Sequence, residues 1–321
     1  MISSQPCALG WAWALAMHED TPRGFAFAGA AFLIWGGLPF YFKALAHIPT
    51  IEVIAHRIVW AVPVALALLV WLGRTADLRA AFRTPRMLGM ACVTAALISV
   101  NWGAYVWLIQ SGSAMEAALG YYINPIFAVL LGATLLGERP SLPQWGAVAL
   151  AAAAVVVLTL EAGSLPLGAL LIVFSWGGYA FFKRALPIGP NQGFALEALI
   201  LTPVALAYLG WAYAAGVLYS VQASALDIVL LLGCGVITAV PLILYANGAK
   251  GLSLSTIAIS SYSIPTVIFL ISVFAFQEPF EGARRIAFPM IWGAMALYIW
   301  EVLRKRRAAL AARSLPRHGA G

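Results

Sequence analysis

The sequence contains few charged residues and few cysteines. Only 10% of its 321 residues are Asp, Glu, Lys or Arg, and only three are Cys. Cys92 and Cys234 lie inside apolar runs, where a small buried side chain is the usual interpretation, and Cys7 lies near the N-terminus. This scarcity argues against a disulfide framework and a cysteine-based metal site. The sequence also has no Asn-x-Ser/Thr glycosylation acceptor.

Motifs that would indicate an enzyme or a metal site are missing as well. The sequence has no His-Glu-x-x-His, no Gly-x-Ser-x-Gly and no phosphate-binding glycine-rich loop with Lys. His18, His47, His56 and His318 do not have the spacing of metal ligands. We therefore expect no catalytic residues, no metal site and no cofactor. An intramembrane enzyme stays open as an alternative, because an enzyme can lack these motifs.

Apolar residues, in contrast, are abundant. They make up 63% of the chain, the mean hydropathy is +0.91, and they occur in blocks of about 20 residues. A soluble domain cannot bury so much apolar surface, so the composition predicts an all-α polytopic membrane protein in contact with the lipid bilayer. The net charge of +7 lies mostly in short loops and a C-terminal tail. That distribution favours a role in membrane orientation and argues against nucleic acid as a partner.

The apolar blocks predict ten membrane spans. They cover residues 25–43, 51–72, 87–109, 114–137, 143–160, 166–185, 193–213, 227–250, 254–276 and 284–303. Residues 1–24 form a leader that the pattern does not assign, with translation starting at Met1 or Met17, and residues 304–321 form a basic tail. If the N-terminus is cytoplasmic, 15 of the 19 Lys and Arg fall on the inner side of the membrane. We therefore expect both termini to be cytoplasmic.

One pattern occurs twice, 140 positions apart. The segment from Tyr122 to Glu138 recurs from Tyr262 to Glu278, and in each copy a Pro follows the Tyr by three residues. The same offset relates Tyr105 to Tyr245. The register therefore holds over much of each half and indicates an internal repeat.

The repeat divides the chain into residues 25–160 and residues 166–303, with five expected spans in each half. Because five is odd, the second half must enter the membrane from the opposite side. Two inverted halves are related by a pseudo-two-fold axis in the membrane plane. That geometry suits a transporter that alternates between inward-open and outward-open states.

Several dispersed motifs occur in a fixed order along the chain. They are WGGLPFYFK at 35–43, EVIAHRIVW at 52–60, NW at 101–102, EAALGYYINP at 116–125, LLGERP at 135–140 and TAVPL at 238–242. Together they resemble the RarD branch of the EamA family, in the drug/metabolite transporter superfamily. The resemblance implies ten helices in two inverted five-helix halves, a bacterial inner membrane, and efflux or exchange of a small solute, with chloramphenicol in the usual label of the branch.

The chain departs from that pattern near the expected solute site. The differing positions are Ala128 in the fourth span, Ala258 and Ser261 in the ninth, and Gln110 and Ser111 at the end of the third. These differences lie close to the place where a solute would bind, so they bear on the identity of the substrate more than on the fold.

Midspan prolines and aromatic residues indicate where a solute would bind. A proline inside a helix removes a backbone hydrogen bond and clashes with the preceding turn, so we expect a bend at both Pro125 and Pro265. Tyrosines on the same faces suit an amphipathic or aromatic solute. The predicted substrate-binding residues are Asn101, Trp102, Tyr105, Tyr121, Tyr122, Asn124, Pro125, Pro241, Tyr245, Ser261, Tyr262 and Pro265. The alternatives are packing kinks for the prolines and an aromatic belt at the membrane surface for the aromatic residues.

Charged residues inside spans are the second signal. Arg57 needs a partner, water or a function, because an arginine at a helix centre costs about 2.5 to 3.5 kcal/mol to insert. At the repeat offset it corresponds to Glu197, and Glu52 and His56 lie on one helix face. We predict a gating or proton-coupling network of these four residues, with a static ion pair as the alternative.

Charged residues at the ends of spans have simpler explanations. We expect Lys183 to reach the membrane surface, as lysines at span ends commonly do. Glu138 and Glu278 end their spans against the helix dipole, so a structural partner is expected for each.

The predicted function is that of a secondary transporter, either an exporter or an exchanger. It would move a small amphipathic metabolite or drug, such as an amino acid or chloramphenicol, by alternating access of the two halves. Direction, coupling to protons and assembly as a homodimer are left open by the sequence. A non-transporting membrane scaffold or sensor is a further alternative, although such proteins usually have an extramembrane domain or long loops.

Overall fold

The computed structural model describes residues 20–135, 137–249 and 251–314, and in these residues the chain is helical without strands. The long helices are α2 (Pro22–Ala44), α3 (Thr50–Trp71), α5 (Pro85–Gln110), α6 (Ala114–Leu135), α7 (Leu142–Ala162), α8 (Leu167–Ala185), α9 (Pro190–Ala214), α10 (Ala225–Ala249) and α13 (Arg284–Ser314). The short elements are α4 (Thr75–Phe82), η1 (Tyr219–Val221), α11 (Leu254–Ser260), α12 (Ser263–Leu270) and the π-helical turn η2 (Ile271–Ala275). Most of the leader, with Met1 and Met17, and the end of the tail lie outside the described residues.

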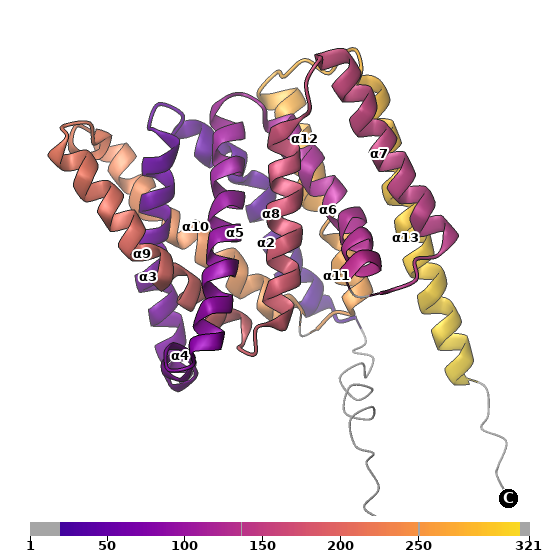
Figure 1. Ribbon diagram of the computed structural model, residues 1–321, viewed down its shortest axis with the longest axis horizontal. Coiled ribbons are helices and arrows are strands. Elements are labelled where there is room, and N and C mark those ends of the chain that lie inside the picture. The colour runs from indigo at the N-terminus through magenta and orange to yellow at the C-terminus, as the bar shows by residue number, and fades with distance from the viewer. Residues whose placement is uncertain (1–19, 136, 250, 315–321) are drawn as a thin grey trace, which may run out of the picture.

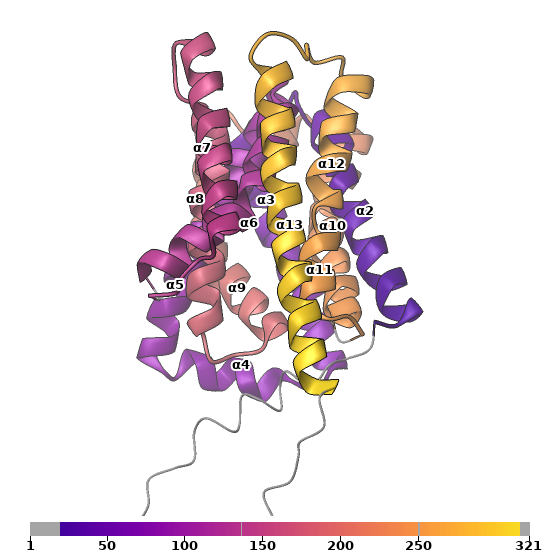
Figure 2. The ribbon, with the colours of Figure 1, turned by 90° about the vertical axis from the view of Figure 1, so that its right-hand side faces the viewer.

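Nine helical segments in the described chain are long and apolar enough to cross a membrane. They lie in α2, α3, α5, α6, α7, α9 and α10, in the segment Thr256–Ala275 and in α13. The 19-residue helix α8 occupies the place of the remaining expected span but is not among the nine. The long helices run up and down along roughly one common axis (Figures 1 and 2). The prediction of an all-α polytopic membrane protein is confirmed, whereas the ten-span inverted repeat stays a prediction.

The outer surface of the helices is apolar. Trp71, Leu142 and Leu160 are 80%, 86% and 78% exposed. In a bilayer such side chains contact lipid, and the helical backbone satisfies its own hydrogen bonds.

Local signals in the sequence place the helix ends. Thr21 caps α2, because its hydroxyl accepts a hydrogen bond from the Gly24 N–H at 3.0 Å, and a proline occupies the first helical position. Ser141 and Gln144 form a reciprocal capping box at the start of α7. Gly163, with a φ of 67°, ends the same helix in the left-handed conformation.

The ninth expected span is divided between α11 and α12, and the break lies just before Pro265. At the equivalent position α6 continues through Pro125. The hydroxyls of Ser261 and Ser263 donate to carbonyls three residues earlier, at 2.8 and 2.7 Å. Such bonds compete with the helical ladder beside a proline that cannot donate. The helix is therefore interrupted only in the second copy of the repeat.

The sequence did not predict two further features. The short helix α4 lies within the basic connection between α3 and α5 and crosses the end of the bundle (Figure 2). Helix α13 extends to Ser314, so the tail expected from residue 304 is helical as far as the structure describes it. Arg304 and Lys305 pair with Glu301 at 2.8 and 3.5 Å, and pairs at this spacing favour the helix.

The helices pair across the two halves of the chain. α2 packs against α10 and α12, and α8 packs against α5 and α6. α3 packs against α9, α7 against α13, and α6 against α12. α7 and α13 form a pair at one side of the bundle (Figure 1). The contacts of α2 with α10 and α12 thus correspond to those of α8 with α5 and α6.

Close approach of α10 to its neighbours depends on two glycines. A Cβ atom on Gly235 would lie 2.0 Å from the backbone oxygen of Trp60 in α3, and one on Gly248 would lie 2.6 Å from the nitrogen of Ala28 in α2. Any larger residue would push these helices apart, as expected for small residues at membrane helix interfaces.

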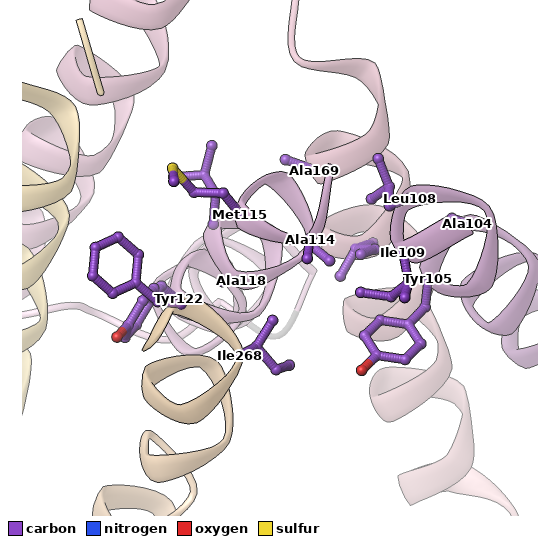
Figure 3. Close-up of a cluster of buried hydrophobic side chains, with 14 of the residues drawn as sticks. Ala104, Tyr105, Leu108, Ile109, Ala114, Met115, Ala118, Tyr122, Ala169 and Ile268 are labelled. Atoms are coloured by element: carbon purple, nitrogen blue, oxygen red, sulfur yellow. The ribbon is translucent and has the colours of Figure 1, made fainter. Parts of the chain in front are cut away.

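The main buried cluster lies where α5, α6, α8 and α12 meet. Figure 3 shows Tyr105 and Leu108 of α5, Met115 and Tyr122 of α6, and Ile268 of α12 within it. The cluster therefore joins both halves and places tyrosine hydroxyls inside an apolar interior.

Candidate functional site

Arg57 of α3 lies inside the bundle and is 5% exposed. Its Nε donates to the hydroxyl of Thr238 in α10 at 3.0 Å, and that hydroxyl donates to the carbonyl of Cys234 at 2.7 Å. The guanidinium carbon lies 4.4 Å from the ring centre of Trp102 in α5 and 5.4 Å from that of Phe42 in α2. Four helices therefore fix the position of this one cation.

The tyrosines predicted near the site form an aromatic chain next to Phe42. The ring of Tyr105 lies 5.9 Å from that of Phe42 and 5.8 Å from that of Tyr121. The Tyr121 hydroxyl donates to the Asn101 Oδ1 at 3.3 Å, and the Asn101 amide donates to the Ser175 hydroxyl at 3.1 Å. The structure thus brings together four of the predicted residues, including Trp102, around Arg57.

A second pair of predicted residues lies between α6 and α12. The rings of Tyr122 and Tyr262 are stacked with centres 6.5 Å apart, and the Tyr122 hydroxyl donates to the Thr266 hydroxyl at 2.9 Å. These two tyrosines occupy equivalent positions in the repeat, so their contact lies on the line along which the halves meet.

Tyr245 does not join either group. Its ring lies 5.6 Å from Trp35 and 6.0 Å from Phe32 of α2, in a separate buried cluster. The other predicted residues are spread over the interior: Asn124, Pro241 and Pro265 are buried, and Pro125 and Ser261 are partly buried. The two equivalent tyrosines of α5 and α10 thus have different surroundings.

The expected pairing of Arg57 with Glu197 is not found in the described residues. The Glu197 carboxylate accepts a hydrogen bond from Lys183 at 2.6 Å and one from the Tyr179 hydroxyl at 3.3 Å. Lys183 therefore does not reach the membrane surface as expected, because its side chain is only 17% exposed and pairs inside. Glu197 therefore pairs with a lysine of the preceding helix, α8, although α3 also packs against α9.

Glu52 has a structural partner that the sequence did not suggest. Its carboxylate accepts hydrogen bonds from the backbone N–H groups of Tyr219 and Ser220 in η1, at 3.0 and 2.7 Å. His56 lies 4.0 Å from the same carboxylate. At the equivalent position Gln192 of α9 donates to Asp77 of α4 at 2.9 Å. In each half, a side chain at the start of the second long helix, α3 or α9, thus binds the segment that joins the second and third long helices of the other half.

The two equivalent carboxylates at span ends have different environments. The Glu278 carboxylate is 8% exposed and accepts hydrogen bonds from the N–H groups of Ala114 and Met115, at 2.7 and 2.9 Å. These groups begin α6, where a negative charge is favoured by the helix dipole. Glu138 is exposed instead and lines, with Pro125, a cavity of about 280 Å³. The two equivalent positions therefore differ, because Glu278 binds the start of α6 whereas Glu138 is exposed.

Outside the spans, Asp20 connects three segments. Its carboxylate accepts hydrogen bonds from the Ser253 N–H and the Thr256 hydroxyl, both at 2.7 Å, and pairs with Arg306 at 3.3 Å. Partial burial raises the pKa of Asp20, but these hydrogen bonds and the arginine outweigh it, so the pKa lies below its usual value.

Sequence reasoning missed several residues of the site. Phe42, Ser175, Thr238 and Thr266 all contact predicted residues. Phe42 and Thr238 lie in two of the motifs quoted above, and their place in those motifs was the sequence signal that could have identified them. The described residues contain no cluster of three or more His, Cys, Asp or Glu that could hold a metal ion.

The fold and this buried polar interior define a multi-pass, all-α membrane protein. A sequence model of the EamA-like transporter family matches residues 22–160. Uncharacterized transporter YojE of Bacillus subtilis is 36% identical over 91% of this chain and 98% of its own length. Protein RarD of Escherichia coli is 33% identical over 90% of this chain and 98% of its own. The chain therefore belongs to the EamA-like transporter family, as a RarD-like member, and the predicted resemblance is confirmed.

Two more distant matches complete the comparison. Chloramphenicol-sensitive protein RarD of Pseudomonas aeruginosa is 29% identical over 89% of this chain and 96% of its own. A solved structure titled "Crystal structure of protein" is 19% identical, with a TM-score of 0.53 over 88% of this chain and 98% of that one, and shows a likeness in fold alone. The protein is thus a transporter of small solutes in a bacterial membrane and not an enzyme.

Proposed function

We propose that this chain is a secondary transporter that exports or exchanges a small amphipathic metabolite or drug by alternating access. Its two halves, residues 25–160 and 166–303, would be inverted five-helix repeats in the bacterial inner membrane, with both termini cytoplasmic. The helix contacts support this arrangement, because α2 contacts α10 and α12 in the way that α8 contacts α5 and α6.

The difference between the two ends of the bundle carries the proposal of alternating access. Glu278 holds the start of α6, whereas Glu138 is exposed beside a cavity. Figure 1 places the connection from η2 to α13 at the end opposite to the one where α13 terminates. In the proposed orientation the protein is closed on the outside and open towards the cytoplasm. The second state would exchange these roles, with Glu138 holding the start of α11.

The solute would bind among the predicted residues near the middle of the bundle. Tyr105, Tyr121, Asn101 and Trp102 supply aromatic surface and polar groups, and the Tyr122–Tyr262 pair lies where the halves would move against each other. Amino acids and chloramphenicol are the first candidates, the latter because one relative is named chloramphenicol-sensitive.

The buried charges would take part in gating. Glu52 of the first half binds η1 of the second, with His56 beside it, so a change of state would rearrange this contact, whereas Glu197 binds Lys183 within the second half. If Glu197 exchanges a proton during transport, Glu197→Gln will abolish the pH dependence of flux. Unchanged pH dependence would leave Glu197 with a structural role only.

Flux into proteoliposomes tests the function. The purified protein is screened with amino acids, aromatic metabolites and chloramphenicol, each with and without a pH gradient. We expect saturable flux of at least one solute and its loss in Tyr105→Ala, while Tyr213→Ala, an exposed tyrosine on α9, serves as the control. Absence of flux for every solute in folded protein would favour a scaffold or sensor.

A further inference from the structure

Arg57 is a buried cation that forms no ion pair with any other residue that the structure describes. The two acidic residues predicted to share a network with Arg57 have other partners. Glu52 binds the backbone of η1, and Glu197 binds Lys183. Because a guanidinium keeps its charge and is costly to bury alone, it requires an anion, and the described part of the chain does not provide one.

The contacts of the guanidinium leave one of its groups for an anion. The Nε atom donates to the Thr238 hydroxyl, and the rings of Trp102 and Phe42 lie 4.4 and 5.4 Å from the guanidinium carbon. The Nη1 atom is buried and has no hydrogen-bond partner within residues 20–135, 137–249 and 251–314. The aromatic contacts and the Thr238 bond hold the guanidinium in place, while an N–H group remains for a ligand.

A neighbouring polar atom is also unpaired. The Tyr105 hydroxyl, 4% exposed as a residue, has no hydrogen-bond partner among the residues that the structure describes. Tyr105 contacts both Phe42 and Tyr121, so it belongs to the same aromatic group as Arg57. The group offers a guanidinium, a phenol and aromatic surface, and it contains no carboxylate that would attract an amine.

We propose that Arg57 binds the carboxylate of the transported solute, which is therefore an organic acid or a zwitterion with an apolar or aromatic body. This inference rests on the proposed transport function and narrows its substrate class. A carboxylate matches the planar fork of the guanidinium, and the tyrosines contact the body of the solute. A neutral molecule such as chloramphenicol lacks the group that would balance the charge of Arg57.

Binding to the purified wild-type chain in lipid nanodiscs tests the inference without any substitution. Three carboxylates, phenylacetate, indole-3-acetate and phenylalanine, are compared with their amides in dilute zwitterionic buffer without chloride or sulfate. We expect saturable binding of at least one carboxylate and at least about tenfold weaker binding of its amide. Equal binding of acid and amide, or binding of none of the three acids, would overturn the inference. Chloride that binds and displaces the acids completely would assign the site to an inorganic anion and overturn it as well.

Variants then connect the binding to Arg57. Arg57→Gln should lose the carboxylate preference, Arg57→Lys should retain only part of it, and Thr238→Val should weaken it because the guanidinium is no longer held. Arg79→Gln, an exposed arginine of α4, is the matched control. A melting curve for each variant verifies folding, and if Arg57→Gln unfolds, the lysine and valine variants decide. An unchanged acid-to-amide ratio in both would overturn the proposal.

Flux separates this inference from the transport function. Transport of neutral solutes alone, unaffected by Arg57→Lys, would overturn the inference and leave the transporter proposal intact. Carboxylate binding with no flux of any solute would overturn the transport function and leave the anion site at Arg57 intact.

Discussion

At the scale of single residues, the interior is organised by buried charges whose partners the sequence only partly revealed. The sequence showed that Arg57 and Glu197 require partners, because both lie in apolar spans. It did not show which ones, since partner choice depends on how helices approach: Glu197 meets Lys183, and Arg57 meets Thr238 and two aromatic rings. A motif search finds such residues, but only packing assigns their contacts.

The Lys183–Glu197 pair makes a prediction about stability. Glu197→Gln removes one charge and leaves Lys183 buried at 2.6 Å from a neutral group, so it should lower the free energy of unfolding by about 3 to 5 kcal/mol. Reversible unfolding in mixed detergent micelles measures it. The double variant Lys183→Met, Glu197→Gln should recover much of the loss, because no unpaired charge remains.

Glu281→Gln is the matched control for that measurement, since Glu281 is exposed and should change stability little. A loss in Glu197→Gln no larger than in this control would show that the pair contributes nothing. A double variant as unstable as the single one would show that the loss comes from something other than the unpaired lysine.

At the scale of helices, the sequence predicted well that a helix forms in each apolar block, but it predicted poorly where a helix is interrupted. Most expected spans correspond to a helix, because long apolar blocks leave no other structure in lipid. The sequence did not distinguish Pro125, which α6 passes through, from Pro265, which follows a break. The difference lies in the serine hydroxyls beside Pro265, which bond to nearby carbonyls in place of the regular helical pattern.

The contact between Glu278 and α6 makes a prediction about local opening. Glu278→Ala leaves the N–H groups of Ala114 and Met115 without acceptors and should destabilise the start of α6 by about 1 to 3 kcal/mol. Amide hydrogen exchange over residues 114–119 should become faster by the corresponding factor. Glu281→Ala is the control, and equal exchange in the two variants would contradict the role of Glu278.

The contacts of Asp20 predict a dependence on pH. Its carboxylate bonds to the start of α11 and pairs with α13, and these partners hold the pKa of Asp20 below its usual value despite partial burial. A lowered pKa stabilises the folded state above the ordinary pKa of Asp, and this contribution is lost as pH falls through the lowered one. The melting temperature of Asp20→Asn should therefore lie below that of the wild type at pH 7, and the difference should disappear in acid. A constant difference at all pH values would exclude this explanation.

At the scale of the whole molecule, the two halves of the chain correspond in some contacts and differ in others. The contacts of α2 and α8 correspond, as do the positions of Glu52 and Gln192. Symmetry fails where Glu278 is buried and Glu138 is exposed, and where α11 and α12 are separate helices while α6 is continuous. The sequence alone predicted the repeat, but it could not show which of the two equivalent carboxylates binds the start of a helix, because both ends have the same residue type.

The most direct test measures the two ends of the bundle at once. Spin labels are placed at Trp107 and Pro279 near the Glu278 end, and at Arg139 and Asn247 near the other, in a chain whose native cysteines are replaced. These pairs are equivalent in the repeat, and all four residues are exposed. In lipid nanodiscs, the account predicts that adding the transported solute, or changing its gradient across proteoliposomes, lengthens one distance and shortens the other. Distances that both stay constant, or both change in the same direction, would contradict alternating access between the inverted halves.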